Sequence, residues 1–494
     1  MRTLVWFRSD LRVEDNTALW HAARVRGGVV GVFVVSPGEW RSHEYAPVKV
    51  GFILRTLREL SASLAALQIP LLVAHAPTPA DIPGVLLEVA AGRGCGALAF
   101  NREYELNERR RDERVREAFA ARGLRVDAYD DQVFAPPGEV RTGDDRYFSV
   151  FTPFKKALYA RMQRIGLPEV RGTPARQPEM PCPSHDVPER IAGFESTVDP
   201  ALWPAGESHA RARLAHFAAE SIRPYKDRRD YPGEDGTSIL SPYLAVGAIS
   251  SRQCLAAAID ANRGARSPLD SGLAGPVHWI SELVWREFYI HIMVGFPRVC
   301  MHRAFQPATE RIRWADNPAH LHAWQRGRTG VPIVDAGMRQ LLTTGWMHNR
   351  VRMIAAMFFT KNLFLDWRLG ESWFMRHLID GFLASNNGGW QWSASTGTDA
   401  APYFRIFNPV SQSRKFDPDG AYIRRYVPEL AGLDAKSIHE PWTIPGLLRA
   451  GVEYPDPLVD LGASRERAIE AFREIKGTPA LREAQGAREA TDAA

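Results

Sequence analysis

The chain has 494 residues, of which 45% are hydrophobic and 24% charged, and its formal net charge at pH 7 is +5. This is the composition of a globular protein of roughly two to four domains. Its apolar runs, such as residues 29–35, are shorter than the about 18 residues that a membrane-spanning helix needs, and the amino terminus lacks a secretory signal, so we expect neither a membrane protein nor an exported one.

The sequence pI of about 9.0 permits a nucleic-acid partner without showing one. His320 and His322 form an HxH pair, but no second cluster accompanies them, and we expect no structural metal. The cysteines are far apart and form no CxxC pair, which favours a reduced, cytoplasmic setting. They are Cys95, Cys182, Cys254 and Cys300.

The first third of the chain alternates between strand-like and helix-like segments. The predicted strands are 3–7, 29–35, 70–75, 97–100 and 124–129, and the predicted helices are 16–26, 48–67, 80–91 and 105–122. Five strands alternating with helices predict an α/β fold with a doubly wound parallel sheet. No GxGxxG follows any of these strands, so we do not expect this sheet to hold a dinucleotide in the Rossmann manner.

The rest of the chain divides by composition. We expect an α/β domain over 1–132 and a linker over 133–207, rich in Pro, Gly and Ser from 167 onward. Residues 208–475 lack strand signals and carry aromatic residues at helical spacing, which predicts an all-α domain. The polar, aromatic-free segment 476–494 is predicted to be disordered.

The stretch 233–250, GEDGTSILSPYLAVGAIS, predicts the start of a helix. Ser241 is a suitable N-cap and Pro242 suits the first helical position. The hydroxyls of Thr237 and Ser238 and the free backbone N–H groups of a helix start would favour a phosphate. The alternative is a well-capped helix with no ligand.

The stretch 278–291 is predicted to be a helix on which Glu282, Trp285, Arg286 and Tyr289 share one face. A carboxylate and a guanidinium among large rings are unusual in a core, because a buried charge needs a partner. The face suits a cavity in which flat rings stack and a carboxylate accepts hydrogen bonds. The alternative is a simple i,i+4 salt bridge between Glu282 and Arg286.

A third predicted helix covers 345–359, where Asn349 and Met353 lie on one face. Asn is a two-way hydrogen bonder that can read a base edge, and Arg350 could bind phosphate. The alternative is a basic surface strip beside a Met-rich core face.

Trp390 and Trp392 follow Asn-Asn-Gly-Gly in a polar stretch that we expect to be loop-like. Arg405 lies downstream, and an indole that stacks on a base would suit a nucleic-acid site. Trp367 and Trp314 are isolated tryptophans upstream. The alternative for each tryptophan is a large core aromatic.

Taken together, these motifs resemble the photolyase/cryptochrome family. The resemblance rests on VWFRSDLRVEDN (5–16), YKDRRDYPGEDGTSILSPYL (225–244), ISELVWREFY (280–289), GWMHNRVRM (345–353) and NNGGWQWSASTGTDAAPYFRIFNP (386–409). It covers nearly the whole chain and is strongest for the class I enzymes that act on cyclobutane pyrimidine dimers. It implies an amino-terminal α/β domain and a carboxy-terminal helical domain that binds FAD in a U shape.

The resemblance also implies roles for individual residues. Arg352 and Asp380 would form an ion pair beside the isoalloxazine, and Asn386 would face the flavin N5, where an amide rather than a carboxylate favours a reduced or semiquinone flavin. For a second, light-harvesting chromophore, methenyltetrahydrofolate, the matching residues are His43, Asn107 and Glu108. The expected FAD contacts are Tyr225, Thr237, Ser238, Ile239, Leu240, Ser241, Arg352, Asp380, Gly381 and Phe382.

Trp390, Trp367 and Trp314 match the family's electron-transfer triad, which carries a hole outward from the flavin. Trp392 and Trp285 would form the walls around a flipped dimer, whose base edges would bond Glu282 and Asn349. The expected DNA contacts are Arg229, Glu282, Trp285, Arg286, Asn349, Arg350, Met353, Trp392, Arg405 and Gln412.

The activity that the resemblance implies is light-driven repair of ultraviolet-damaged DNA by a monomeric carbon–carbon lyase. Reduced FAD would donate a photo-excited electron to the dimer, the ring would split and the electron would return. Phe382 stands where the most similar relatives have a second Asp, and Met301 stands where a lysine would lie near a folate, so a deazaflavin or no antenna stays open. The alternatives are a cryptochrome-type photoreceptor without repair activity, repair of (6-4) photoproducts, against which Met353 stands in place of a histidine, and a flavin-free nucleic-acid binder.

Overall fold

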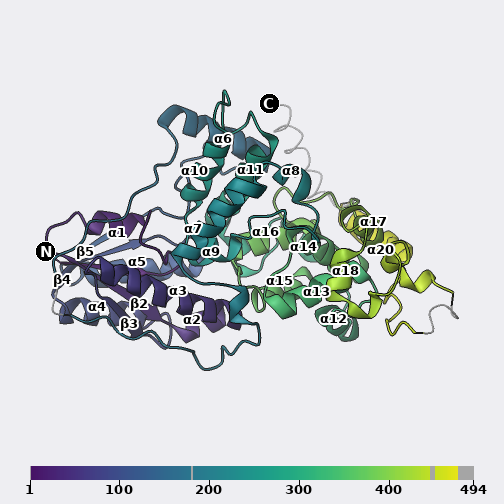
Figure 1. The fold of residues 1–494 in the computed structure, drawn as a ribbon, viewed down its shortest axis with the longest axis horizontal. Helices are drawn as coiled ribbons and strands as arrows, with labels where there is room; N and C mark the ends of the chain where they lie inside the picture. Colours follow the sequence, from purple (N-terminus) through teal and green to yellow (C-terminus); the bar gives the residue numbers. More distant parts are fainter. Residues whose placement is uncertain (1, 180–181, 446–450, 477–494) are drawn as a thin grey trace. The chain divides into compact units, whose positions relative to one another are not determined.

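The structure is a computed structural model that describes residues 2–179, 182–445 and 451–476. The chain forms two compact units, and each is made of several chain segments. The first unit comprises 1–228, 237–297 and 375–384, and the second comprises 229–236, 298–374 and 385–494. The chain in Figure 1 runs from purple at its amino terminus to yellow.

A five-stranded parallel sheet in the order β3-β2-β1-β4-β5 forms the amino-terminal part of the first unit. This confirms the predicted α/β fold. The strand order reverses at β1, which pairs with both β2 and β4. The strands are β1 (Arg2–Phe7), β2 (Val29–Val35), β3 (Leu71–His75), β4 (Cys95–Asn101) and β5 (Arg125–Tyr129).

Helices cover both faces of this sheet, which is why its central strands are apolar on both sides. On one face α4 (Ile82–Gly92) and α5 (Leu106–Ala120) contribute Leu86 and Phe119 to a core that includes Trp6 and Phe100 from the strands. On the other face α1 (Thr17–Ala22) lies over β1 and β4, and α3 (Pro47–Ala66) packs on β3. β2 reads VVGVFVV and is buried throughout its length. Its β-branched residues suit a strand that is enclosed on both faces.

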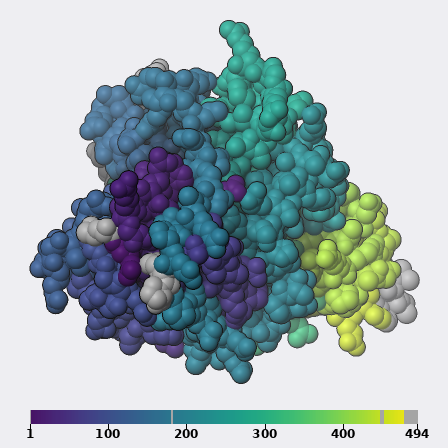
Figure 2. All heavy atoms as spheres, turned by 60° about the vertical axis from the view of Figure 1, so that its left-hand side comes forward, coloured from purple at the N-terminus to yellow at the C-terminus, as the bar shows by residue number. Residues whose placement is uncertain are grey.

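The first unit also contains helices that follow the last strand of the sheet in the sequence. The stretch predicted as a linker includes α6 (Phe151–Ile165). Its later part lies along the α/β core and is bound to it by hydrogen bonds from Gln177 N to Leu67 O and from His185 N to Leu71 O. Figure 2 shows the blue-to-teal atoms of this stretch beside the purple amino-terminal residues. The helices of the unit are α1 (Thr17–Ala22), α2 (Pro37–Ser42), α3 (Pro47–Ala66), α4 (Ile82–Gly92), α5 (Leu106–Ala120), α6 (Phe151–Ile165), α7 (Glu207–His216), α8 (Tyr225–Arg228), α9 (Ser241–Val246), α10 (Ser251–Ala261) and α11 (Ala274–Gly295).

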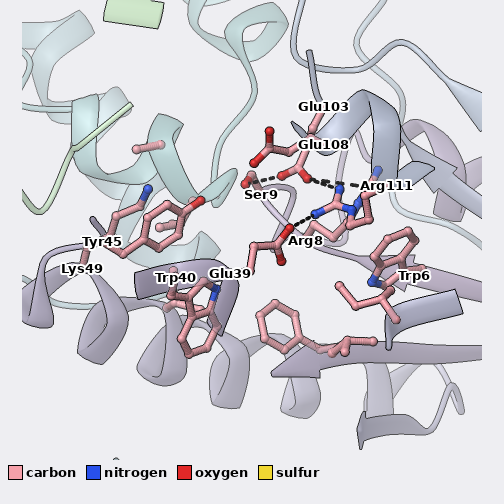
Figure 3. Close-up of a pocket in the computed structure, with 16 residues that line it drawn as sticks. Trp6, Arg8, Ser9, Glu39, Trp40, Tyr45, Lys49, Glu103, Glu108 and Arg111 are labelled. Atoms are coloured by element: carbon pink, nitrogen blue, oxygen red, sulfur yellow. Dashed lines mark hydrogen bonds and ion pairs between the residues drawn. The ribbon is translucent and has the colours of Figure 1, made fainter. Parts of the chain in front are cut away.

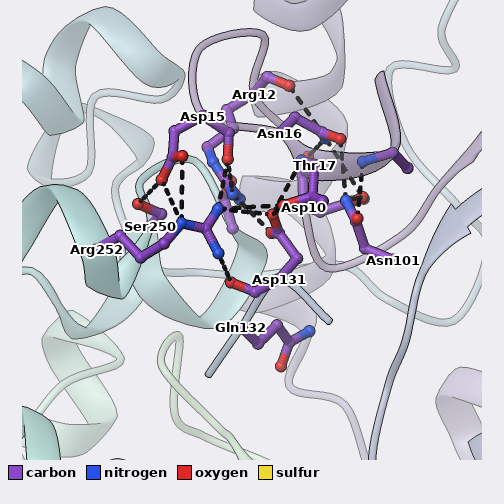
Figure 4. A network of polar contacts seen from close by, with 12 residues as sticks. Asp10, Arg12, Asp15, Asn16, Thr17, Asn101, Asp131, Gln132, Ser250 and Arg252 are labelled. Carbon is purple, nitrogen blue, oxygen red and sulfur yellow. Dashed lines mark hydrogen bonds and ion pairs between the residues drawn. The ribbon is translucent and has the colours of Figure 1, made fainter. Parts of the chain in front are cut away.

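A buried polar network ties the loop after β1 to the start of α10 (Figure 4). Asp131 accepts hydrogen bonds from Arg12 and Arg252, at 2.6 and 2.8 Å, and Arg252 also reaches Asp15 at 2.9 Å. Burial alone would raise the pKa of Asp131, but the two guanidinium groups hold it well below its usual range. Because Arg12, Arg252, Asp15 and Asp131 are each paired with an opposite charge or hydrogen-bonded to one, the network fixes α10 against the α/β core.

The second unit is helical in the part that the structure describes, as predicted. A single parallel bridge joins Ala315 to Leu365. In the described ranges of the whole chain, the helices are too short or too polar to cross a membrane. The helices of this unit, some of which begin or end in the first, are α12 (Pro318–Gln325), α13 (Pro332–Thr344), α14 (Asn349–Met357), α15 (Trp367–Met375), α16 (Leu383–Ala394), α17 (Pro409–Phe416), α18 (Ala421–Tyr426) and α20 (Leu461–Lys476).

One secondary-structure expectation is wrong. The stretch around Trp390 and Trp392 is the helix α16, although it contains Asn-Asn-Gly-Gly. Tertiary contacts described below hold this helix, and they outweigh its poor intrinsic propensity. The predicted domain boundaries stay a prediction, and nearly all of the predicted disordered tail lies outside the described residues.

Candidate functional site

A short turn between α15 and α16 carries three of the predicted FAD contacts. Ser241 Oγ donates a 2.6 Å hydrogen bond to Asp380 Oδ2, and the next residue, Gly381, accepts one of 2.7 Å from Lys49 Nζ. Phe382 completes the turn, with the Arg286 guanidinium 4.8 Å from its ring centre. Each residue of the turn is therefore held by a side chain from a different helix.

The stretch before α9 has an unusual backbone. Ile239 has φ +47°, a left-handed conformation that is strained for a β-branched residue and often marks a functional site. Ser241 is the first helical residue and Leu240 is the N-cap, so the predicted capping role of Ser241 is wrong. Its hydroxyl group donates the hydrogen bond to Asp380 instead of capping the helix.

The other predicted FAD contacts of this unit lie near the same stretch in the sequence. Thr237 and Ser238 are half-buried, and Arg213 Nε donates to the Ser238 carbonyl at 2.8 Å. Tyr225 is buried against Phe217. Their contact with FAD stays a prediction.

The helix α11 presents the predicted mixed face. Trp285 is half-buried and stacks on Phe151 with ring centres 3.6 Å apart, so Phe151 covers one face of the indole. Arg286 donates to the Gln132 carbonyl at 2.8 Å, and burial lowers its pKa. Arg286 is thus engaged within the first unit, and its predicted contact with DNA stays a prediction, as does that of Glu282.

In the second unit, Trp390 lies on α16 in an aromatic cage. Its ring centre is 5.0 Å from that of Phe374, 5.6 Å from Phe359 and 5.9 Å from Trp324. Trp390 Nε1 is buried and has no hydrogen-bond acceptor among the described residues.

Contacts along the chain relate the three predicted relay tryptophans. Gly370 lies one helical turn after Trp367 and packs directly on the Trp390 ring. Trp314 precedes the residue that bridges to Leu365, and its ring centre is 5.2 Å from that of Phe364. Trp390 and Trp367 are buried, whereas Trp314 is partly exposed. The three residues thus differ in exposure, and their role as a relay stays a prediction.

A buried polar network that the sequence did not reveal holds α16. Asn386 Nδ2 donates to the Glu371 carbonyl at 3.0 Å, and Asn387 Nδ2 donates to the Glu371 carboxylate at 2.9 Å. Gln391 bonds Asn387 Oδ1 at 2.9 Å, and Lys361 Nζ binds the Ala394 carbonyl at the helix end at 3.1 Å. These contacts explain why a Gly-rich segment is helical. Glu371 is 15 residues from Asn386, so no local pattern identifies the pair.

The start of α14 carries the predicted base-reading residues. Asn349 is exposed and its Nδ2 lies 4.0 Å from Met353 Sδ, which confirms that the two share a face. Arg350 forms a 2.8 Å ion pair with Asp230, so its charge is already compensated. Arg352 Nε donates to the Met347 carbonyl at 2.8 Å. The predicted pair between Arg352 and Asp380 joins residues of different units and stays a prediction.

Trp392 lies two residues after Trp390 on α16 and therefore faces nearly the opposite side of the helix. It is half-buried, with the Phe407 ring 6.4 Å away. Arg405 is exposed and Gln412 is half-buried on α17. Roles at DNA for these residues, and for Arg229 beside Asp230, stay predictions.

A pocket lies at the carboxyl ends of the strands in the first unit (Figure 3). It adjoins the point where the strand order reverses, the usual place for a ligand in such sheets. His43 Nδ1 lies 3.0 Å from Glu108 Oε1, and Asn107 Nδ2 lies 3.3 Å from His43 Nε2. The structure thus brings the three predicted antenna residues together. Glu108 Oε2 is buried and has no partner among the described residues.

Charged residues that the sequence did not single out fill the deep part of this pocket. Arg111 forms 2.7 Å ion pairs with Glu39 and Glu103, and Arg8 lies 4.2 Å from the Trp6 ring centre. Burial alone would raise the pKa of Glu103, but Arg8 and Arg111 lower it to about 2. The recess that remains measures about 50 Å³, far below the 300–1,000 Å³ or so of a typical ligand pocket.

The pKa values of two groups beside this pocket, Glu105 and His43, are raised, for different reasons. Burial, together with the charges of Glu108 and Glu103, raises the pKa of Glu105 to about 7. Burial would lower the pKa of His43, but Glu108 raises it. Perturbed groups gathered in a cleft are a common sign of a functional site.

The fold corresponds to a family of FAD-binding proteins. Residues 3–179 match the family model described as DNA photolyase, and residues 279–474 match the model described as the FAD binding domain of DNA photolyase. The chain belongs to the DNA photolyase family, and FAD is the cofactor of its helical domain.

The relatives in this family match over almost their whole length. The chain is 43% identical to a deoxyribodipyrimidine photo-lyase of Escherichia coli, covering 95% of this chain and 98% of that one, and 39% identical to a deoxyribodipyrimidine photo-lyase of Neurospora crassa, covering 95% and 81%. Among solved structures, a class III photolyase from Agrobacterium tumefaciens is 34% identical, with a TM-score of 0.85 over 97% of this chain and 98% of that one. A cryptochrome from Synechocystis is 27% identical, with the same TM-score over 95% and 99%.

Proposed function

We propose that the protein repairs cyclobutane pyrimidine dimers in ultraviolet-damaged DNA under light, as a deoxyribodipyrimidine photo-lyase acting in the cytoplasm as a monomer. The observation that carries this is the chain-wide similarity to enzymes of that name. The burial of Trp390 and Trp367 and the partial exposure of Trp314 support a relay through these three residues. FAD, when bound and reduced, supplies the photo-excited electron that opens the cyclobutane ring.

The residues of the turn 380–382 would hold the cofactor in the first unit. Asp380 is oriented by Ser241, and the strained backbone at Ile239 precedes that serine. In the second unit, Asn386 commits its Nδ2 to the Glu371 carbonyl. Its Oδ1 is then the atom that would accept a hydrogen bond from a flavin N–H. These features fit a flavin.

The tryptophans would return the flavin to its reduced state. An electron would pass to the flavin from Trp390, and the hole would move to Trp367 and then to Trp314, where solvent and an external reductant can reach it. Because Trp390 Nε1 has no acceptor among the described residues, the oxidised indole has no neighbouring group to take its proton. The hole would therefore move before the proton is lost.

Trp285 and Trp392 would contact the flipped dimer. Phe151 stacks on one face of Trp285 and holds its indole, and base–aromatic stacking contributes about 1–3 kcal/mol per base. Asn349, exposed at the start of α14, would bond a base edge.

An antenna chromophore would bind beside the pocket in Figure 3, next to Glu108, which lines it. Glu108 Oε2 is a buried acceptor with no partner among the described residues, which fits a ring that presents N–H donors, as a pterin does. The recess of about 50 Å³ is too small to take such a ring whole. The ring would therefore lie beside His43 and Asn107, and the folate is favoured over a deeply inserted chromophore.

The variant Glu108→Gln tests the antenna site. It replaces one acceptor oxygen by a donor, so we expect the near-ultraviolet antenna band to disappear while the FAD bands persist. Glu113→Gln on the same helix changes an exposed carboxylate and serves as the matched control. An antenna band of full height in Glu108→Gln would contradict this placement.

The proposed repair activity is tested with an oligonucleotide that carries one cyclobutane dimer. We expect dimer loss under blue light with the reduced enzyme and none in the dark. Equal loss in light and dark, or no loss in either, would refute the proposal. Flavin bands with no repair would favour the cryptochrome-type photoreceptor, for which the similarity to the Synechocystis cryptochrome is the supporting observation.

A further inference from the structure

Lys49 is a buried lysine that the proposed function leaves unused. It lies on α3 between Val48 and Val50, and its side chain is 3% exposed. It forms no ion pair within the described ranges; its ammonium group donates 2.7 Å to the Gly381 carbonyl and lies 3.7 Å from the Tyr45 ring centre. Burying a charged group costs free energy unless the group is paired or hydrogen-bonded, so the burial of this ammonium group calls for a role for its contacts.

Two side chains at or just before the start of α3, Lys49 and Glu44, contact the same short segment of the chain, residues 375–384. The ammonium group of Lys49 binds Gly381, and Glu44, five residues earlier, lies 3.9 Å from Arg376. The segment 375–384 belongs to the first unit, although the residues on either side of it belong to the second. The stretch 44–49 therefore anchors the segment that carries Asp380 and Phe382.

Lys49 also lines the pocket of Figure 3, where its nitrogen is drawn beside Tyr45. Burial lowers the pKa of Lys49 to about 8, although Glu105, Glu103, Asp380 and Glu108 all favour the charged form. The lysine is thus mostly protonated at pH 7, in a field set by carboxylates of the pocket and by Asp380.

We propose that Lys49 is a positioning residue for the flavin, which holds the Gly381 carbonyl and so fixes the turn 380–382 at the cofactor. Ser241 orients Asp380 on one side of this carbonyl, and Arg286 covers Phe382 on the other. Lys49 completes the set, since no other described side chain bonds the Gly381 carbonyl. The inference rests on the proposed binding of FAD at this turn.

The first test is the affinity of the apoprotein for FAD, followed by flavin fluorescence. Lys49→Met keeps the length and apolar stem but removes the charged donor, and losing a hydrogen bond from a charged group raises the dissociation constant for FAD about tenfold. Lys49→Arg keeps a charged donor and is expected to recover most of the affinity. Lys436→Met removes an exposed lysine and is expected to leave the affinity unchanged.

The second test is the pH dependence of the wild-type affinity between pH 7.5 and 9.5. The groups that face Lys49 are Tyr45, Glu103, Glu105, Glu108 and Asp380. Glu105 loses its proton near pH 7 and burial raises the pKa of Tyr45 well above its usual value, so Lys49 is the group that titrates in this window. We expect FAD to bind more weakly as the pH rises, and the dependence to be absent in Lys49→Met.

Apoprotein stability separates this role from a purely structural one. Folding lowers the pKa of Lys49 from 10.5 to about 8, so the unfolded chain binds more protons between these values and the Lys49 contribution to stability rises with pH there. FAD affinity is expected to change in the opposite direction. A Lys49→Met protein that binds FAD as tightly as wild type, with the same pH dependence, would overturn the inference; a wild-type protein that binds no FAD would instead refute the proposed function.

Discussion

At the scale of single residues, the three tryptophans of the proposed relay differ in exposure. Trp390 and Trp367 are 2% and 1% exposed, whereas Trp314 is partly exposed and packs on Phe364 and Phe472. A hole that reaches Trp314 is accessible to a reductant in water, and one that stays on Trp390 is not. The middle indole is therefore the residue whose loss should interrupt the path.

We expect Trp367→Phe to block photoreduction of oxidised flavin but to spare repair by chemically reduced enzyme. A phenyl ring is much harder to oxidise than an indole, so the hole would stay on Trp390 and recombine with the flavin electron. The measurement is the light-induced loss of the oxidised flavin band, followed by a repair assay after dithionite reduction. Trp20→Phe, on α1 in the first unit, is the control. Loss of both activities in Trp367→Phe would contradict the assigned triad.

At the scale of secondary-structure elements, α15 and α16 are locked by the packing of a glycine against an indole. A Cβ atom at Gly370 would lie 2.1 Å from Trp390 Cη2, a distance that no real contact reaches. The α15 backbone therefore approaches the Trp390 ring as closely as it does only because residue 370 has no side chain.

Gly370→Ala should therefore destabilise the protein by overpacking, and we expect the free energy of unfolding, measured with denaturant, to fall by about 1–3 kcal/mol. We also expect slower photoreduction, because Trp390 would be displaced. Gly389→Ala on α16 is the matched control, because no atom lies within 4 Å of its added Cβ. Alanine favours a helix over glycine by about 1 kcal/mol, so this control should be neutral or slightly stabilising. Equal stability of the two variants would show that the described helix packing is wrong.

Sequence patterns predicted the elements whose signals are local. The strand at 29–35 was recognisable because every residue in it is apolar or glycine, and the Asn349–Met353 face because helical spacing puts the two together. The helix α16 was not predicted, because the partners that hold it, Glu371 and Lys361, lie outside it in the sequence. Lys49 was missed for the same reason, since Gly381 is 332 residues away.

At the scale of the whole molecule, the formal net charge of +5 is small for a chain that we propose to bind DNA. Many arginines are already paired, as Arg350 is with Asp230. Exposed arginines such as Arg405 are thus better placed to replace counterions on phosphates.

DNA affinity should therefore fall with salt, with a slope of about 0.9 in log–log terms for each phosphate contacted. We expect Arg405→Ala to lessen that slope by about 1, measured by binding to a dimer-containing duplex at several salt concentrations. Arg116→Ala, which removes an exposed arginine from α5, should leave the slope unchanged. A slope that is flat in the wild type would count against arginine–phosphate contacts.

The path of the chain between the two units has a consequence for engineering. The backbone passes from one unit to the other after residues 228, 236, 297, 374 and 384. A gene divided after residue 228, 236, 297 or 374 would separate the short segment 375–384 from the sheet-bearing portion that it completes, and a gene divided after residue 384 would split the second unit. Split-protein reporters and domain transplants made from this chain would therefore need matched pieces from both sides of the division, expressed together.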